Sequence, residues 1–113
     1  MKPKNENENT CKNVADYIED IVEGKTDETL SEYFERKELD VTYLVSSNGE
    51  YESVRSYVTM NGPVIYIDTE KEAVCINTGF EKDSWGLSKN ASDAVDAYYE
   101  EIFEDMMFSR YGG

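Results

Sequence analysis

The chain has 113 residues, the length of one domain, and 39% of them are hydrophobic, which argues against a disordered chain. Its 25 acidic residues outnumber its 11 basic ones and give a net charge of -14. This charge repels DNA, RNA and anionic membranes, because all three are polyanions, and it favours a protein partner with a cationic surface.

The amino-terminal segment MKPKNENENT contains no apolar stretch like that of a signal peptide, and no run in the chain is long and apolar enough to cross a membrane. We therefore expect a cytoplasmic protein. In a reducing compartment Cys11 and Cys75 should be free thiols, and they would pair only if the fold places them side by side.

Two helices are expected in the first part of the chain. Residues 1–9 are mostly Asn, Glu and Lys, a composition that predicts a disordered tail before one domain over residues 10–113. Thr10 can cap a first helix, in which apolar side chains recur at helical spacing until Gly24 ends it. A second helix is expected to open at Thr26 and to end near residue 37.

The middle of the chain has the alternation and the turn residues of short strands. Asn48-Gly49 is a strong hairpin signal because both residues tolerate a positive φ angle. The segment DTEKE, residues 68–72, predicts another turn, since it lacks the ligand spacing of a calcium loop. We expect an antiparallel meander of four strands, at residues 41–46, 51–60, 64–68 and 73–77, followed by a loop over residues 79–87 around Trp85.

A last helix is expected to start near Ser88 or Asn90. On a helical wheel one arc is apolar and should pack inward: Ala91, Ala94, Val95, Tyr98, Tyr99, Ile102 and Met106. The opposite arc carries only carboxylates: Asp93, Asp96, Glu100 and Glu104. The predicted fold is α+β, with two N-terminal helices, a four-stranded meander and a C-terminal helix on the sheet, in the order ααββββα.

The chain lacks the residues of common catalytic sites. It contains no His, which is the most frequent general base and metal ligand, and its seven Gly form no phosphate-binding loop. Pairs of carboxylates are inevitable among 25 acidic residues and carry little weight. We expect no enzyme activity, no cofactor and no metal site.

The acidic arc of the last helix invites a functional interpretation. Like charges one turn apart repel by a few tenths of a kcal/mol, and every charge between Lys89 and Arg110 is negative. The excess recurs on the first helix, at Asp16, Glu19, Asp20 and Glu23. Either these are ordinary solvated faces, or rows of carboxylates imitate phosphates and occupy a basic nucleic-acid channel of another protein.

The segment NGPVIYIDTEKEAVCINTGFEKDSWGLSKNASDAVDAYYEEIFED resembles small acidic proteins of mobile genetic elements in Gram-positive bacteria. The matching residues are Gly62, Pro63, Ile65, Asp68, Thr69, Trp85, Ser88, Asp93, Asp96, Glu100 and Glu101. The upstream segment LSEYFE also fits, so the resemblance spans roughly residues 27–105. Some proteins of this kind are anti-CRISPR inhibitors of type II-A systems, so the resemblance implies a Cas9 or its guide complex as the partner, inside a bacterial host.

The expected contact residues combine the acidic rows with the tryptophan. They are Asp93, Asp96, Glu100, Glu101, Glu104, Asp105, Trp85, Asp16, Glu19, Asp20 and Glu23. A DNA mimic aimed at another defence, such as a restriction enzyme, would carry the same features. A third alternative is a small regulatory or assembly module, monomer or weak homodimer, that uses an apolar edge formed by Tyr99, Phe103, Met107 and Phe108.

Overall fold

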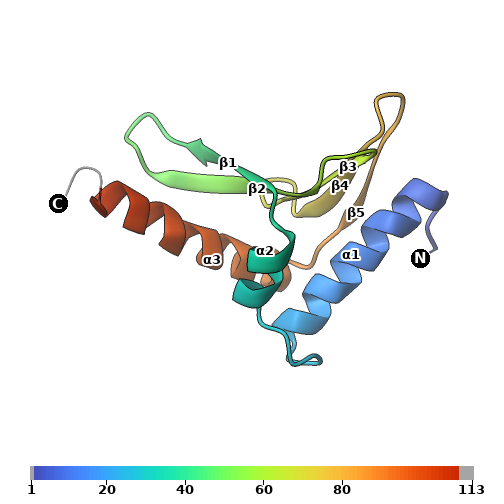
Figure 1. Cartoon of the computed structure of the whole chain (residues 1–113), viewed down its shortest axis with the longest axis horizontal. Helices are drawn as coiled ribbons and strands as arrows, with labels where there is room; N and C mark the ends of the chain where they lie inside the picture. The colour runs from blue at the N-terminus through green and yellow to red at the C-terminus, as the bar shows by residue number, and fades with distance from the viewer. Residues whose placement is uncertain (1, 110–113) are drawn as a thin grey trace.

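A computed structural model describes residues 2–109 and shows three helices and a five-stranded sheet (Figure 1). In chain order the elements are α1 (Glu6–Val22), α2 (Leu30–Lys37), β1 (Asp40–Val45), β2 (Tyr51–Thr59), β3 (Val64–Asp68), β4 (Ala73–Asn77), β5 (Lys82–Gly86) and α3 (Lys89–Met107). The α+β class is confirmed, and the sheet has one strand more than expected.

The sheet is an antiparallel meander in the order β1-β2-β3-β4-β5. The predicted turn at Asn48-Gly49 is confirmed, because Gly49 has φ 82° and its N–H donates to the carbonyl of Ser46. The predicted turn at residues 69–72 is confirmed as well, with Glu72 at φ 51°. Tight connections of this kind explain why neighbouring strands in the sequence are also neighbours in the sheet.

The predicted loop over residues 79–87 is wrong, because Lys82–Gly86 forms β5 at the sheet edge. This strand, KDSWG, holds no β-branched residue, so its sequence gives little sign of a strand. Pairing with β4 forms it instead, and Trp85 stands opposite Val74. The Trp85 side chain therefore lies on the same face of the sheet as the core residue Val74.

The first two helices begin at other residues than predicted. Asn5 rather than Thr10 caps α1, with its side chain accepting from the N–H of Glu8 at 2.9 Å. Residues 6–9, which were expected in a disordered tail, are helical. Acidic residues in this first turn interact favourably with the helix dipole. Thr29 rather than Thr26 caps α2, where it forms a capping box with Glu32.

The later boundaries agree better with the sequence. The predicted end of α2 near residue 37 is confirmed, and α3 begins after the N-cap Ser88 as expected. Gly24 follows the C-cap residue Glu23 of α1 and has φ 75°, a conformation that favours glycine after a helix end.

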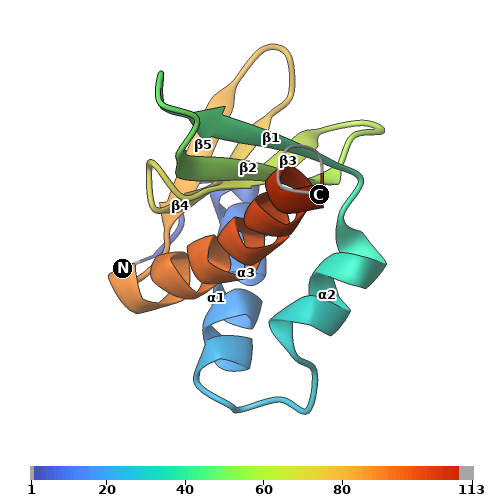
Figure 2. The same ribbon diagram turned by 90° about the vertical axis from the view of Figure 1, so that its left-hand side faces the viewer.

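All three helices lie on one face of the sheet (Figures 1 and 2). The core forms between that face and the helices, from residues such as Ile18, Phe34, Val54, Ile67 and Val95. No helix of the described chain covers the opposite face, where the rings of Tyr57 and Tyr66 lie 5.1 Å apart. Cys11 and Cys75 are both buried and both free thiols.

The buried side of α3 differs from the predicted arc. Ser92, Val95, Tyr99 and Phe103 are buried, whereas Met106, expected inside, is 48% exposed. Phe103 is only 5% exposed, so it belongs to the interior and not to an exposed apolar edge. The helix packs on β2, and its buried residues Val95, Tyr99 and Phe103 follow each other at a spacing of four, so the contact side lies to one side of the middle of the predicted arc.

Candidate acidic binding surface

The acidic row on the first half of α3 is largely engaged by the chain itself. Asp96 is half-buried, and its Oδ1 accepts a hydrogen bond of 2.6 Å from the hydroxyl of Tyr51. Asp93 forms an ion pair with Lys89 one turn earlier, at 3.4 Å. The sequence pattern placed both residues in an outward row without a partner, and the structure gives each of them a partner.

The acidic row on α1 is also neutralised or used within the fold. Asp16 pairs with Lys12 at 2.6 Å, and Glu23 pairs with Lys25 at 2.8 Å. Glu19 accepts hydrogen bonds of 2.7 Å from both the backbone N–H and the hydroxyl of Ser88. Glu19 therefore holds the N-cap residue of α3 against α1, which is a structural role. Asp20 is half-exposed on the same helix and has no ion-pair partner within residues 2–109.

Trp85 lies apart from the acidic end of α3. Its half-buried ring belongs to β5 and packs beside α1, with Nζ of Lys12 at 6.0 Å from the ring centroid. The structure therefore does not bring the eleven predicted contact residues onto one surface.

Four of the predicted residues gather on one part of α3. We call them the acidic ridge: Glu100, Glu101, Glu104 and Asp105, all exposed on the C-terminal half of α3. None of them has an ion-pair partner among residues 2–109. Residues one turn apart on a helix are about 5–6 Å apart at Cβ, so Glu100 and Glu104 form a closely spaced pair.

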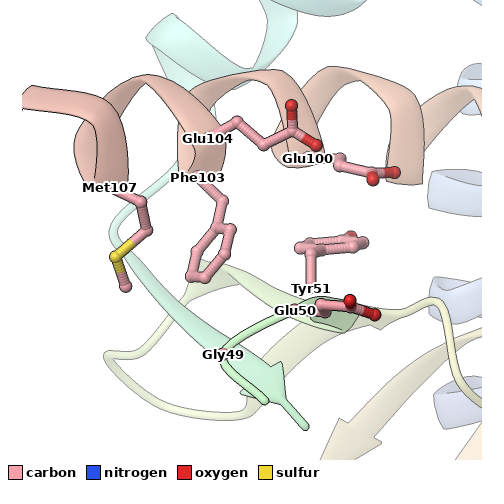
Figure 3. Close-up of a pocket in the computed structure, with 7 residues that line it drawn as sticks. All are labelled: Gly49, Glu50, Tyr51, Glu100, Phe103, Glu104 and Met107. Atoms are coloured by element: carbon pink, nitrogen blue, oxygen red, sulfur yellow. The ribbon is translucent and has the colours of Figure 1, made fainter. Parts of the chain in front are cut away.

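A cleft lies between this half of α3 and the β1–β2 hairpin (Figure 3). This hairpin cleft has a volume of about 440 Å³. Its apolar lining comes from Tyr51, Phe103 and Met107, and its carboxylates are Glu100, Glu104 and Glu50. In Figure 3 the Phe103 and Met107 side chains point from α3 toward the hairpin, and Tyr51 lies between the hairpin and the helix.

Sequence reasoning missed Glu50. This residue follows the Gly49 turn and is exposed, and only the crossing of the hairpin over α3 brings it near the ridge. No local sequence pattern predicts that the hairpin crosses α3. A search for acidic residues next to a strong turn signal would have named Glu50 as a candidate, without its partners.

Tyr51 connects the cleft to the core. Its ring centroid lies 5.9 Å from that of Phe103, and its hydroxyl donates to Asp96. Burial raises the pKa of Tyr51, and the hydrogen bond to the Asp96 carboxylate raises that pKa further. The phenol therefore stays protonated at neutral pH and fixes Asp96 beside the cleft.

Several of the residues that carry the resemblance described above have a structural role in this fold. Asp68 is 2% exposed, and its Oδ1 accepts from the backbone N–H groups of Glu70 and Lys71. The Thr69 hydroxyl accepts from the N–H of Val54 at 3.0 Å. Gly62 has φ 86°, which favours glycine. These residues hold turns and strands in place.

The surface offers charge and apolar contact area. Among residues 2–109, no three His, Cys, Asp or Glu side chains converge as metal ligands. No helix in the described part of the chain is long and apolar enough to span a membrane. The arrangement can therefore attract a cationic group electrostatically and hold an apolar side chain in the hairpin cleft.

Comparisons with protein-family models, curated proteins and solved structures found no match to this chain.

Proposed function

We propose that this chain is a non-catalytic inhibitor that binds a basic nucleic-acid-binding surface of another protein through the acidic ridge and the hairpin cleft. One observation carries the proposal. Five exposed carboxylates, the ridge and Glu50, gather at one end of the molecule without a basic partner among residues 2–109. In the other predicted rows Asp16, Glu23 and Asp93 each pair with a lysine, whereas the ridge residues have no such partner among residues 2–109.

The geometry supports imitation of a phosphate row. The phosphates of one DNA strand are about 3.4 Å apart along the helix axis, and residues one helical turn apart have Cβ atoms about 5–6 Å apart. Glu100 and Glu104 supply such a row on α3, and Glu50 adds a carboxylate from across the cleft. Binding should be fast at low salt and should weaken as the salt concentration rises.

A type II-A Cas9 is the first target to test, because the resemblance to anti-CRISPR proteins implies it. A restriction enzyme with a basic DNA channel would suit the same surface. The homodimeric module has less support, since Tyr99 and Phe103 of its proposed apolar edge are buried in the interior.

The decisive experiment distinguishes the effect of the ridge on inhibition from the effect of the net charge of the chain. The variant Glu100→Lys/Glu104→Lys reverses two ridge charges. The matched control Asp27→Lys/Glu70→Lys makes the same net change at exposed positions outside the ridge. Cas9 loaded with guide RNA is mixed with each protein, and cleavage and target-DNA binding are measured. Inhibition should be lost in the ridge variant and kept in the control.

Two results would contradict the proposal at different levels. Equal inhibition by both variants would show that the ridge is only a solvated face. Undiminished cleavage by several type II-A enzymes, even with wild-type protein in large molar excess, would exclude Cas9 as the target. In that case the same pair of variants is applied to restriction enzymes.

A further inference from the structure

A second opening lies on the other flank of α3. This α2–β1 groove, of about 460 Å³, is bounded by α2, the start of β1 and the C-terminal half of α3. Figure 2 shows α2, β1 and α3 at this end of the molecule, and residues of these elements line the groove. Its apolar lining includes Leu39, Val41, Tyr98, Ile102 and Met106. It shares no lining residue with the hairpin cleft.

Two lining residues are unusually exposed for their size. The Leu39 side chain is 59% exposed, and Met106 is 48% exposed. They belong to different parts of the chain, the segment before β1 and the end of α3, yet both line the same groove. Apolar side chains scattered singly on a surface are ordinary, whereas convergence in one groove is typical of a docking site.

The rim of the groove determines which partner fits. Glu35, Glu38 and Asp40 border the apolar lining, and no Lys or Arg among residues 2–109 lines the groove. A second copy of this chain would bring the same carboxylates and a net charge of -14 against them. A segment with Lys or Arg beside its apolar side chains is complementary to the rim.

The conformation of that segment follows from the edge of the sheet. β1 is an edge strand, so an extended segment could in principle pair with it. However, Oδ1 of Asp40 accepts a 2.9 Å hydrogen bond from the N–H of Val41. The Asp40 side chain thus engages one backbone N–H at the start of β1, which leaves one donor fewer for a pairing strand. A helix needs no such pairing, because its backbone groups are satisfied internally.

We propose that the α2–β1 groove binds an amphipathic helix of a partner protein, with apolar side chains in the groove and Lys or Arg beside the acidic rim. The groove lies on the opposite flank of α3 from the hairpin cleft, so this proposal stands independently of the ridge and its target. Apolar anchors of such a helix recur at positions i, i+3 or i+4, and i+7.

The test uses designed peptides of about 18 residues. One peptide contains Leu and Lys arranged as an amphipathic helix. A second has the same composition in an order that scatters the Leu residues around the helix. Binding to the full chain is measured by fluorescence anisotropy at low and at high salt. The groove variants are Leu39→Asp and Met106→Asp, and the matched control is Met60→Asp, which adds the same charge at a 46% exposed apolar residue outside the groove.

The wild-type chain should bind the amphipathic peptide more tightly than the scattered one at both salt concentrations. Each groove variant should weaken this binding by about tenfold or more, as expected when an apolar anchor is lost. Met60→Asp should change it little. Equal binding of the two peptides would overturn the proposal, because charge alone would then explain the affinity. An equal loss of peptide binding in Met60→Asp would also overturn the proposal. So would light scattering that shows a wild-type dimer which Met106→Asp dissociates.

Discussion

The hydroxyl of Tyr51 on β2 donates a 2.6 Å hydrogen bond to Oδ1 of Asp96 on α3. This contact joins the hairpin to the helix beside the cleft, so Asp96 serves the fold as well as the surface charge. A charge reversal at Asp96 would disturb the Tyr51 contact together with any binding. For this reason the ridge is tested at Glu100 and Glu104, where the described chain makes no ion pair.

Tyr51→Phe should lower the free energy of unfolding at neutral pH by about 1 kcal/mol, the worth of one partly buried hydrogen bond. The Tyr51 pKa is raised above its ordinary value of 10.0, mainly by burial. A group whose pKa is raised in the folded state stabilises the protein fully below the unfolded pKa and loses that contribution as the pH rises through the folded pKa. The difference between variant and wild type should therefore shrink above pH 10.

Urea unfolding of both proteins at pH 7, 9 and 11 checks this prediction. Other tyrosines also ionise at high pH, but they are present in both proteins, so the comparison isolates Tyr51. A difference that stays constant from pH 7 to pH 11 would show that the contact with Asp96 does not depend on the phenolic proton.

Tyr99→Phe should cost more than Tyr51→Phe. The Tyr99 hydroxyl lies 2.6 Å from the Ser56 hydroxyl and donates to Oε1 of Glu38 at 2.9 Å, so Ser56 donates to Tyr99. Tyr99 and Ser56 are both 0% exposed, and the substitution would leave the Ser56 hydroxyl without a partner. The expected loss is about 2 kcal/mol in urea unfolding. Tyr43→Phe is the control, because its hydroxyl has no hydrogen bond within residues 2–109, and it should cost less than about 0.5 kcal/mol.

Asp68 should stabilise the fold mainly through its hydrogen bonds to the turn and less through its ion pair. It accepts two backbone hydrogen bonds, and its Oδ2 lies 3.2 Å from Nε of Arg55. Asp68→Ala removes all three contacts from a carboxylate that is 2% exposed, and should cost about 3 kcal/mol. Arg55→Ala removes the ion pair and the contact of the half-exposed guanidinium with the Tyr66 ring, but it leaves both backbone hydrogen bonds of Asp68, and it should cost about 1 kcal/mol. Equal costs in thermal or urea unfolding would assign the stability to the ion pair.

The two thiols should be unreactive in the native protein. Burial raises the pKa of Cys11 to about 12 and also raises the pKa of Cys75. Both thiols remain protonated at pH 8, so little reactive thiolate forms. Both side chains are also buried, so a reagent has no access to them. A colorimetric thiol reagent should count two thiols in denaturant and react very slowly without it. Rapid labelling of either cysteine in the native state would contradict this burial.

The sequence predicted two turns and one helix start correctly from local chemistry, although it misplaced the N-caps of α1 and α2. The Asn48-Gly49 turn, the turn at residues 69–72 and the start of α3 after Ser88 all follow from residues whose preferences act within a few positions. The strand at residues 82–86 was missed because its formation depends on pairing with β4 and not on its own residues.

The candidate surface was predictable only in part, for a similar reason. Periodicity identified Glu100 and Glu104 as outward-facing, which the structure confirms. It could not reveal that Asp96 meets Tyr51, that Glu19 binds Ser88 or that Glu50 lies across the cleft. Each of these contacts joins segments far apart in the chain, and a single helical wheel contains no information on such neighbours.

The placement of the ridge beyond the core contacts of α3 separates two kinds of evolutionary constraint. Tyr51, Tyr99 and Phe103 hold the helix, whereas Glu101 and Asp105 project from it without contacts that the described fold requires. Substitutions on the ridge can therefore accumulate without loss of folding. Under the proposed function, the residues that contact a partner and the residues that hold the fold would therefore be separate sets.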